Sequence, residues 1–559
     1  MEKITMIKIV SEGIVEQDIP DNIKLLGKLK KFAELVKDCK VGEPKSYLSD
    51  YFGQEELENL ETGHSAVIAN DVGTGKSTAI INTAFAMHNE NIYILVNRRY
   101  CMIQLKREYM KLIGIAVSDW CDDAVIGYDT RNIKFMTYQK LAKKGSFYKL
   151  PENSIVVLDE IHYLLNDAVF SYEPEIIKNI IHANKNCTKR IYISATIDEV
   201  LDEIIMLESK YDEPVQIDKI FQNDDTHKIN HTLIDQIYLI SNSYEHISLK
   251  FYNYSDINML ADYLNANSKN GGKSLVFVRN KNRGETLKEK LTDSEMVFAT
   301  ENGMTILSEI SGNAEYSCSS LLATKVLENG VSIVDSKIGT IVIDEIDSVT
   351  FRQFLGRVHN SRVNPRPLTV IIPDYTLSEL IQYSRQCYQK INTINYVIKN
   401  IDYCMSNFQE YSPYVYYDRD DKAPKVNYLA LRKLTNLNHY VEELINDEMT
   451  SPHAYIRSIQ RLLFLPEIIE EKQFLNYDDM YAFKTGIKNA YDEFVLSPKL
   501  KTDRDKLAQD LIKVVSKTNI YHKKITGNQI QIDKINDILA CAGISTKIQS
   551  LGETFGLIE

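Results

Sequence analysis

The stretch Ala69–Thr78 constrains what this chain can fold into more than any other part of it. It reads Ala-Asn-Asp-Val-Gly-Thr-Gly-Lys-Ser-Thr, follows the apolar run Ala66–Ile68, and precedes a run of helical composition, Ala79–Met87. A strand, a glycine-rich loop and a helix in this order are the context of a phosphate-binding loop, where backbone N–H groups and the helix N-terminus face anionic oxygens. A flexible surface turn is the alternative interpretation.

The residue types in this loop each have a chemical reason. Glycines let the backbone approach phosphates closely, Lys76 is placed to reach the terminal phosphates, and the Ser77 hydroxyl is placed to bind a magnesium ion. Asn70 stands where the strict pattern has its first glycine. We expect the nucleotide to bind at Gly73, Thr74, Gly75, Lys76, Ser77 and Thr78.

Length and composition set outer limits. The chain has 559 residues, enough for about two to four domains. Its eight cysteines include no Cys-x-x-Cys pair, which argues against a zinc ribbon or a disulfide framework. No apolar run approaches the length of a membrane span, and no secretory signal is visible, so we expect a cytoplasmic protein without a membrane partner. The net charge of −12 does not favour nucleic-acid binding, although a local basic groove is compatible with it.

Short apolar runs alternate with helix-like segments after the phosphate loop. This alternation is typical of βαβ units and a mostly parallel sheet, in which ligands bind at the carboxyl ends of the strands. The expected strands are Ile92–Val96, Ile133–Met136, Ile155–Leu158 and Ile191–Ile193. Functional side chains are therefore expected directly after each run. Before the loop, a strand-like start at Ile4–Val10 and a helix over Asn22–Lys40 are expected.

Acidic residues follow the third of these runs. Asp159 fits the carboxylate that holds magnesium beside a phosphate loop, and Glu160 fits the group that orients and polarises the attacking water. His162 could connect this site to neighbouring motifs by hydrogen bonding. A strand that ends in solvated acids is the alternative.

Other strand ends carry hydroxyl, amide and guanidinium groups. Ser194 and Thr196 flank an alanine and could connect the acidic pair to a moving element. Arg98 and Thr137 are donors of the kind that contact a nucleic-acid backbone. An ordinary solvated turn is an equally good interpretation of each one taken alone.

A second alternation indicates a second α/β lobe over about residues 245–375, after a connection expected at Asp198–Asp256. Its apolar runs are Ser274–Val278, Met296–Ala299, Ser320–Ala323, Ile338–Ile343 and Leu368–Ile372. Arg357 is the candidate arginine finger, a cation that stabilises the phosphoryl transition state from another lobe. Asp344-Glu345 also follows an apolar run, but no phosphate loop lies in its half, so we expect a solvated strand end there.

Taken together and in order, these stretches resemble the superfamily 2 helicases of DExH type. The corresponding motifs are Gly73–Ser77, Asn97–Arg99, Thr137–Gln139, Asp159–His162, Ser194–Thr196, Leu275–Val278, Ala323–Gly330 and Gln353–Asn360. The resemblance covers about residues 60–375. It differs from the family pattern at Asn360, where an arginine is usual, and at Ser332, where an acidic residue is usual.

The resemblance implies two RecA-like lobes with ATP and Mg²⁺ between them. Gln353, Arg357 and Gly330 would then approach the nucleotide from the second lobe. Nucleic acid, with DNA somewhat favoured over RNA, would cross both lobes at Arg98, Thr137 and Thr324. The implied activity is that of an ATP-dependent helicase or translocase. A remodelling ATPase that does not unwind, or a slow nucleotide-gated binding module, is the alternative.

The expected organisation is therefore α/β, with two parallel-sheet lobes in tandem and a mostly helical C-terminal domain. Its parts are an N-terminal extension at 1–60, a first lobe at 61–240, a second lobe at 241–375 and the helical domain at 376–559. Amphipathic spacing predicts helices in that last domain at Ser378–Ile394, Tyr428–Met449, Ala454–Leu463, Asp478–Phe494 and Asp503–Lys517. A protein partner could bind there.

Overall fold

A computed structural model of the chain describes residues 6–7, 38–41, 47–71, 73–88, 90–117, 120–210, 231–240, 244–298, 315–325, 333–358, 360–361, 364–518, 532–551 and 554–558. Contacts divide the chain into two compact units. The first comprises Met1–Ser248 with Leu264–Glu467, and the second comprises Leu249–Tyr263 with Ile468–Glu559. The domain boundaries expected from the sequence stay predictions.

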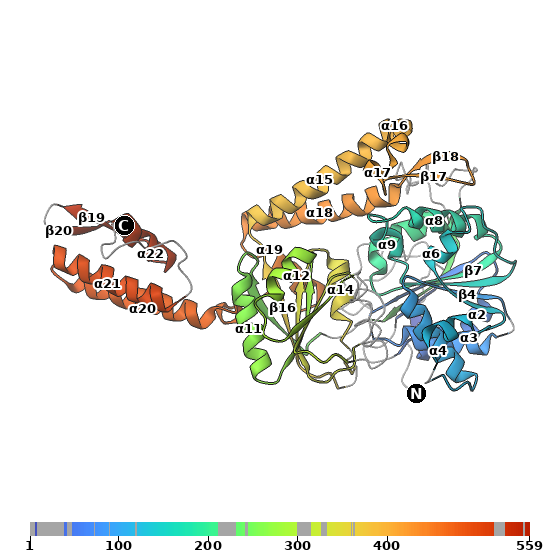
Figure 1. Cartoon of the computed structure of the whole chain (residues 1–559), viewed down its shortest axis with the longest axis horizontal. Coiled ribbons are helices and arrows are strands. Elements are labelled where there is room, and N and C mark those ends of the chain that lie inside the picture. The colour runs from blue at the N-terminus through green and yellow to red at the C-terminus, as the bar shows by residue number, and fades with distance from the viewer. Residues whose placement is uncertain are drawn as a thin grey trace. The chain divides into compact units, whose positions relative to one another are not determined.

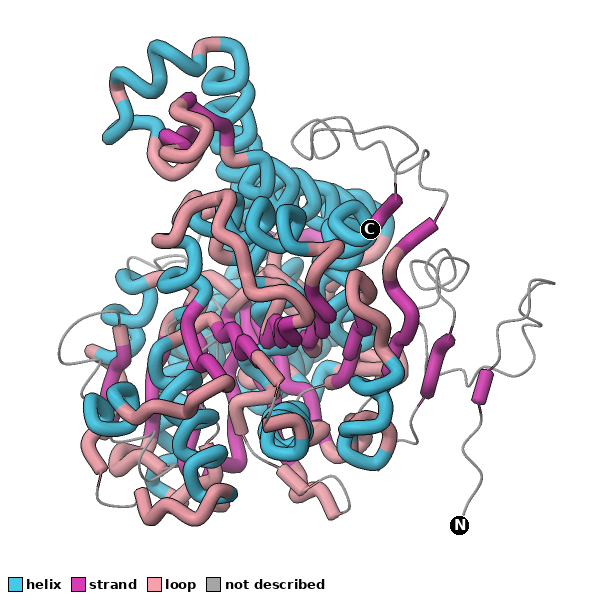
Figure 2. The backbone as a smooth tube through the Cα atoms, turned by 90° about the vertical axis from the view of Figure 1, so that its right-hand side faces the viewer, coloured by secondary structure: helices cyan, strands magenta, loops and turns pink. Residues whose placement is uncertain are grey.

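A mostly parallel sheet forms the centre of the first lobe (Figures 1 and 2). In the described residues its order is β1 (Met6–Ile7), β2 (Asp38–Val41), β10 (Ile234–Ile240), β3 (Ser65–Asn70), β7 (Thr188–Ser194), β6 (Ser154–Asp159), β4 (Ile92–Val96) and β5 (Ile133–Thr137). Among the strand pairs described for this sheet, only β1–β2 is antiparallel. Its inner strands are mostly buried because hydrophobic clusters cover both faces of the sheet.

Helices connect and cover these strands. They are η2 (Leu48–Asp50), α2 (Gln54–Asn59), α3 (Lys76–Ala86), α4 (Arg99–Leu112), α5 (Asp122–Gly127), α6 (Tyr138–Ala142), α7 (Tyr163–Asn166), α8 (Glu173–Asn184) and α9 (Ile197–Glu208). The hairpin β8 (Ser209–Lys210) with β9 (His231–Thr232) follows α9.

Two expectations for this lobe were wrong. The stretch after Asp198 is no mere connection, since it contributes helix α9 and strand β10, which pairs with β3 next to the phosphate loop. The end of the helix expected over Asn22–Lys40 lies instead in strand β2, because β2 completes the sheet beside β10. The rest of that segment, residues 22–37, lies outside the described residues.

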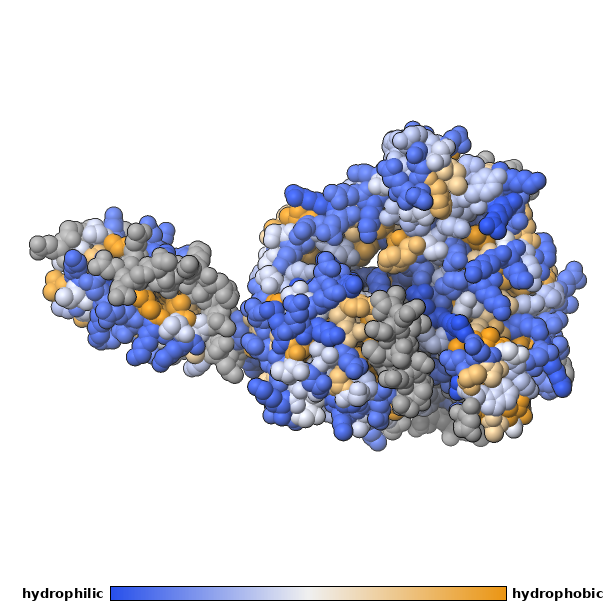
Figure 3. All heavy atoms as spheres, viewed as in Figure 1, coloured by the Kyte–Doolittle hydropathy of each residue, from blue (hydrophilic) through white to orange (hydrophobic). Residues whose placement is uncertain are grey.

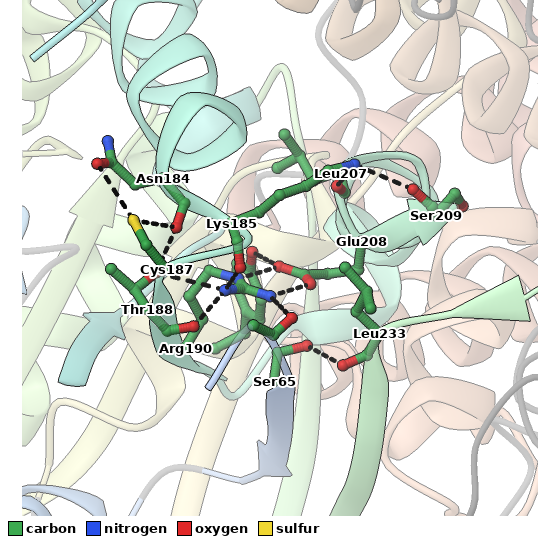
Figure 4. A network of polar contacts seen from close by, with 12 residues as sticks. Ser65, Asn184, Lys185, Cys187, Thr188, Arg190, Leu207, Glu208, Ser209 and Leu233 are labelled. Atoms are coloured by element: carbon green, nitrogen blue, oxygen red, sulfur yellow. Dashed lines mark hydrogen bonds and ion pairs between the residues drawn. The ribbon is translucent and has the colours of Figure 1, made fainter. Parts of the chain in front are cut away.

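A buried ion pair between Arg190 and Glu208 lies near the start of β7 (Figure 4). The Arg190 guanidinium donates to both carboxylate oxygens of Glu208 at 2.6 Å, and to the carbonyl of Gly63 at 2.8 Å. Both charged side chains are at most 1% exposed. The pair therefore ties β7, the end of α9 and the turn before β3 into one block at the end of the sheet opposite the phosphate loop.

The second lobe has its own parallel sheet. Within the first unit its order is β16 (Leu368–Asp374), β15 (Ile338–Asp344), β12 (Lys273–Val278), β14 (Ser320–Ala323) and β13 (Ser294–Val297). The lobe also contains α12 (Lys281–Lys288) and α14 (Ser348–Leu355), and it is preceded by β11 (Ile247–Asn253) and α11 (Ile257–Lys269). Together the two sheets give the tandem RecA-like arrangement expected from the sequence.

Asp344 and Glu345, at the end of β15, are not the solvated strand end that we expected. Asp344 is 1% and Glu345 is 2% exposed. Asp344 forms an ion pair with Arg283, and Glu345 accepts hydrogen bonds from the backbone N–H groups of Ile346 and Asp347. Burial raises the pKa of both carboxyl groups. These acids serve the packing of the second lobe.

The C-terminal region is mostly helical, as predicted. It contains α15 (Leu377–Lys399), α16 (Ile401–Ser406), α17 (Phe408–Tyr411), the hairpin β17 (Val415–Asp418) with β18 (Ala423–Val426), α18 (Tyr428–Thr450) and α19 (Ala454–Leu462). The second unit adds η5 (Glu471–Gln473), α20 (Tyr477–Leu496), α21 (Lys501–Lys517), α22 (Ile532–Cys541) and the hairpin β19 (Lys547–Leu551) with β20 (Thr554–Ile558). Hydrophilic residues cover most of the visible face of the protein (Figure 3). None of the helices in the described residues is long and apolar enough to cross a membrane.

Helix α18 contacts both lobes through neighbouring side chains, and lies side by side with α15 (Figure 1). Arg432 Nε donates to Glu203 of α9 in the first lobe at 2.7 Å. Lys433 Nζ lies 3.0 Å from the carboxylate of Asp347, which caps α14 in the second lobe. Apolar residues of the same region, including Val397 and Leu429, join the first lobe's hydrophobic cluster. We call this α15–α18 pair the brace.

The buried Lys433–Asp347 pair gives a test of the brace. Burial acts to raise the pKa of Asp347, but the charges of Lys433 and Lys325 outweigh it and lower that pKa. Lys433→Met leaves Asp347 buried without this partner and should cost about 3–5 kcal/mol. We expect a fall of several degrees in the melting temperature of the full chain. Glu443→Gln, in an exposed pair on the same helix, should change nothing measurable.

The pH dependence of this loss has a defined sign. Because the folded pKa of Asp347 is lowered, the pair stabilises the fold at neutral pH, and its contribution disappears as the pH falls through that folded pKa. The difference in melting temperature between wild type and Lys433→Met should therefore shrink in acid. Equal melting temperatures at neutral pH would show that the brace does not hold the second lobe through Lys433.

Candidate active site between the two lobes

The phosphate loop joins β3 to α3 through glycines with left-handed backbone conformations. Gly73 has φ of 80° and Gly75 has φ of 79°, values that a residue with a side chain adopts only with strain. A Cβ atom at Gly75 would also lie 3.3 Å from the ring of Tyr47. The Leu48 N–H donates to the Thr74 carbonyl at 2.9 Å, so the segment before β3 lies against the loop.

Lys76 and Thr74 point inward, and Ser77 and Thr78 are exposed at the start of α3. The Lys76 ammonium donates to the carbonyls of Asn70 at 2.8 Å and Asp71 at 3.3 Å. Burial lowers the pKa of Lys76, although the negative charges of Glu160 and Asp159 act to raise it. The loop therefore places the Lys76 cation, backbone N–H groups and the exposed Ser77 hydroxyl at one end of the sheet.

The acidic pair stands two strands away, at the end of β6. Glu160 has φ of 53°, a left-handed conformation that is uncommon for a residue other than glycine and is a recurring feature of functional sites. Burial and the neighbouring charge of Glu160 raise the pKa of Asp159. Burial also acts to raise the pKa of Glu160, but a hydrogen bond with His162 and the charge of Lys76 lower it.

A chain of hydrogen bonds connects the acidic pair to the end of β7. His162 Nδ1 lies 3.4 Å from the Glu160 carboxylate and 3.0 Å from the Ser194 hydroxyl. Ser194 Oγ lies 3.2 Å from Thr196 Oγ1 and accepts the Thr196 N–H at 3.0 Å. His162, Ser194 and Thr196 are all at most 1% exposed. The three residues singled out as connecting residues in the sequence thus lie together.

The second lobe reaches this chain through Gln353 on α14. Gln353 Nε2 lies 3.5 Å from both Glu160 Oε2 and Thr196 Oγ1. Arg357 holds the same side chain, because its guanidinium donates to the Gln353 carbonyl and to Gln353 Oε1, each at 2.9 Å. Residues from both lobes therefore meet at the acidic pair, with the Arg357 cation next to Gln353.

Arg352 adds a contact between the lobes that the sequence did not reveal. Its guanidinium donates to both carboxylate oxygens of Asp198, at 2.7 and 2.8 Å. Asp198 opens helix α9, directly after the Ser194–Thr196 motif. A planar, bidentate arginine–carboxylate pair fixes orientation as well as distance. Its partners are 154 residues apart, so no local pattern could have predicted the pairing.

The candidate nucleic-acid contacts lie at strand ends in both lobes. Arg98 follows β4 and Thr137 is the last residue of the neighbouring strand β5. Arg98 pairs with Asp167 at 3.1 Å, and the Thr137 hydroxyl accepts the Lys140 N–H. Thr324 follows β14 in the second lobe and is half-buried. Gly330 and Ser332 lie outside the described residues. Asn360 has a structural contact, since its amide exchanges two hydrogen bonds with the backbone of Arg366.

Comparisons with known proteins bear on this site. Residues 29–199 match the family model "Type III restriction enzyme, res subunit". No curated protein sequence matches the chain.

Among solved structures, S. cerevisiae Dbp5 bound to RNA and ADP BeF3 is 15% identical, with 62% of this chain and 86% of Dbp5 covered and a TM-score of 0.40. The Mycobacterium smegmatis helicase Lhr bound to ssDNA and AMP-PNP is 12% identical, with 66% of this chain and 49% of Lhr covered and a TM-score of 0.39.

The family match covers the lobe that carries the phosphate loop, the acidic pair and the Ser194–Thr196 motif. The second sheet, with Gln353 and Arg357 facing that lobe, completes the arrangement. The chain is therefore similar to that family over residues 29–199, and its two sheets together have a tandem RecA-like fold.

Proposed function

We propose that this chain hydrolyses ATP between its two lobes, using Lys76, Ser77, Asp159 and Glu160 from the first and Gln353 and Arg357 from the second, and that the resulting opening and closing moves it along nucleic acid. The observation that carries the proposal is the approach of Gln353 to within 3.5 Å of Glu160. Through this contact the second lobe reaches the group proposed to polarise the attacking water.

The chemistry of the site fits a magnesium nucleotide. Ser77 and Asp159 offer the hard oxygen ligands that Mg²⁺ takes, and magnesium needs only one or two of these when phosphate oxygens and water supply the rest. The ion, when bound, would neutralise phosphate charge. Gly73 and Gly75 would let the loop follow the phosphates, with the Lys76 ammonium inside it.

Each residue of the site has a separate proposed role. Glu160, which its partners keep ionised, would orient the attacking water and accept its proton. Arg357 would stabilise the charge that develops on the phosphoryl group. His162, Ser194 and Thr196 would transmit the state of the acidic pair to α9, which contacts both Arg352 and the brace. Arg98, Thr137 and Thr324 would hold the strand as the lobes open and close.

Separate losses of binding and turnover test the roles of Lys76 and Glu160. Lys76→Ala should abolish tight ATP binding, because it removes the cation inside the loop. Glu160→Gln should keep ATP binding and lower hydrolysis by about 10²- to 10⁴-fold, the usual contribution of a positioned base. Titration with a fluorescent ATP analogue and a phosphate-release assay measure the two effects.

The matched control for this pair is Glu152→Gln, an exposed carboxylate before β6 that should leave both measurements unchanged. Normal turnover by Glu160→Gln would show that the acidic pair has been assigned the wrong role.

Arg357→Ala tests the contribution of the second lobe. An arginine that stabilises the transition state should affect turnover more than binding, by about 10³- to 10⁵-fold where it acts as a finger. Steady-state hydrolysis at saturating ATP, with the dissociation constant measured alongside, separates the two. Arg385→Ala, which removes an exposed arginine of α15, is the control. Intact turnover in Arg357→Ala would rule out the inter-lobe finger.

A further inference from the structure

Phe170 is an exposed aromatic side chain in an unusual place. It lies in the short segment between α7 and α8 and is 66% exposed, more than any other large apolar side chain among the described residues of the first lobe. An exposed phenylalanine contributes little to the stability of its own fold, since its apolar surface stays in water. Its ring therefore offers apolar surface to another molecule.

The segment that carries Phe170 is held firmly on several sides. Asp167 accepts hydrogen bonds from Asn97 and Arg98, each at 3.1 Å, and its carbonyl accepts the Phe170 N–H at 3.0 Å. The buried amide of Asn427 donates to the carbonyls of Ala168 at 2.8 Å and Ser171 at 3.2 Å. The ring is thus presented to solvent from a fixed backbone.

A cationic side chain of the second lobe lies over this ring, and one of the first lobe binds the segment that carries it. Lys325, which follows Thr324 in the second lobe, has its ammonium 5.7 Å from the centroid of the Phe170 ring. Arg98, the candidate phosphate contact of the first lobe, bonds to the segment's own Asp167. Phe170 therefore stands between the proposed strand contacts of the two lobes, where a polymer touching both would pass.

We propose that Phe170 is a base-stacking residue, on which an unpaired base of single-stranded nucleic acid stacks as the strand crosses from one lobe to the other. The inference rests on the proposed function, which supplies the strand. An exposed aromatic ring in a region that also carries cations is a combination that binds single strands, because the cations meet phosphates and every base has a π-face. The fixed backbone keeps the ordering cost of binding low.

The test measures the affinity of the full chain for fluorescein-labelled oligo(dT) and oligo(U) by fluorescence anisotropy. Phe170→Ala should weaken binding by roughly 5- to 150-fold, the range that one base–aromatic stack contributes. Phe170→Tyr should bind as wild type does, and Phe170→Leu, which stays apolar but lacks a π-face, should bind as Phe170→Ala does. Phe147→Ala removes another exposed phenylalanine of the same lobe, 55% exposed, and should bind as wild type does.

Further measurements separate stacking from charge and from misfolding. The slope of affinity against salt concentration should be the same in wild type and Phe170→Ala, because no phosphate contact is removed. Trp120 is the only tryptophan of the chain, so Phe170→Trp in a Trp120→Phe background provides a single reporter at this site. Its emission should be quenched by either oligonucleotide, and much less by one whose central residues are abasic.

The outcomes distinguish a failure of base stacking at Phe170 from a failure of the proposed function. Wild type that binds neither oligonucleotide would overturn the proposed function and, with it, the role of Phe170. Wild type that binds while Phe170→Ala or Phe170→Leu binds equally well would overturn base stacking alone, and would leave the exposed ring to a protein partner. Loss with one polymer only would support the inference and identify the strand as DNA or RNA.

Discussion

The side chain of Gln353 is the contact on which the arrangement of the site depends. It is fully buried, it is held by Arg357 from its own lobe, and it approaches both Glu160 and Thr196 of the other lobe. An amide can donate and accept at once, so it can join a cation on one side to a carboxylate and a hydroxyl on the other. Any relative movement of the lobes must change these contacts, so the surroundings of the acidic pair depend on the position of the second lobe.

The brace contacts the two helices next to the Gln353 side chain, α9 and α14. Arg432 and Lys433 are adjacent in α18, yet one binds α9 and the other binds the residue that caps α14. These two helices begin directly after the Ser194–Thr196 motif and carry Gln353, respectively. The N-terminal part of the helical region is therefore integrated with the two lobes, since its apolar residues also enter the first lobe's core. We infer that it limits how far the lobes can separate.

Much of the architecture could be predicted from the sequence. The expected strands over Ile92–Val96 and Ser320–Ala323 match the observed ones, because strands buried on both faces appear as continuous apolar runs. The long helices α15 and α18 were also predicted from their apolar spacing. Strand ends were good positions to search because a parallel sheet gathers its carboxyl ends at one edge.

What could not be predicted depends on contacts between distant residues. Strand β10 could not be recognised within the expected connection, because its place beside β3 is fixed by pairing across the sheet. Buried Asp344 at the end of β15 pairs with Arg283 of helix α12, and the pairing of Lys433 with Asp347 spans 86 residues. Phe170 gave no signal because exposure is a property of the folded surface. Roles for the site residues stay predictions, and Gly330 lies outside the described residues.

The most direct measurement is the rate of ATP hydrolysis by the purified full chain, alone and with single-stranded DNA, duplex DNA and RNA, at low and moderate salt. The account predicts that at least one single-stranded polymer stimulates hydrolysis, because a strand bound across both lobes favours the arrangement in which Gln353 meets Glu160. Slow hydrolysis that no polymer changes would contradict it, and would indicate a nucleotide-gated binding module in place of a motor.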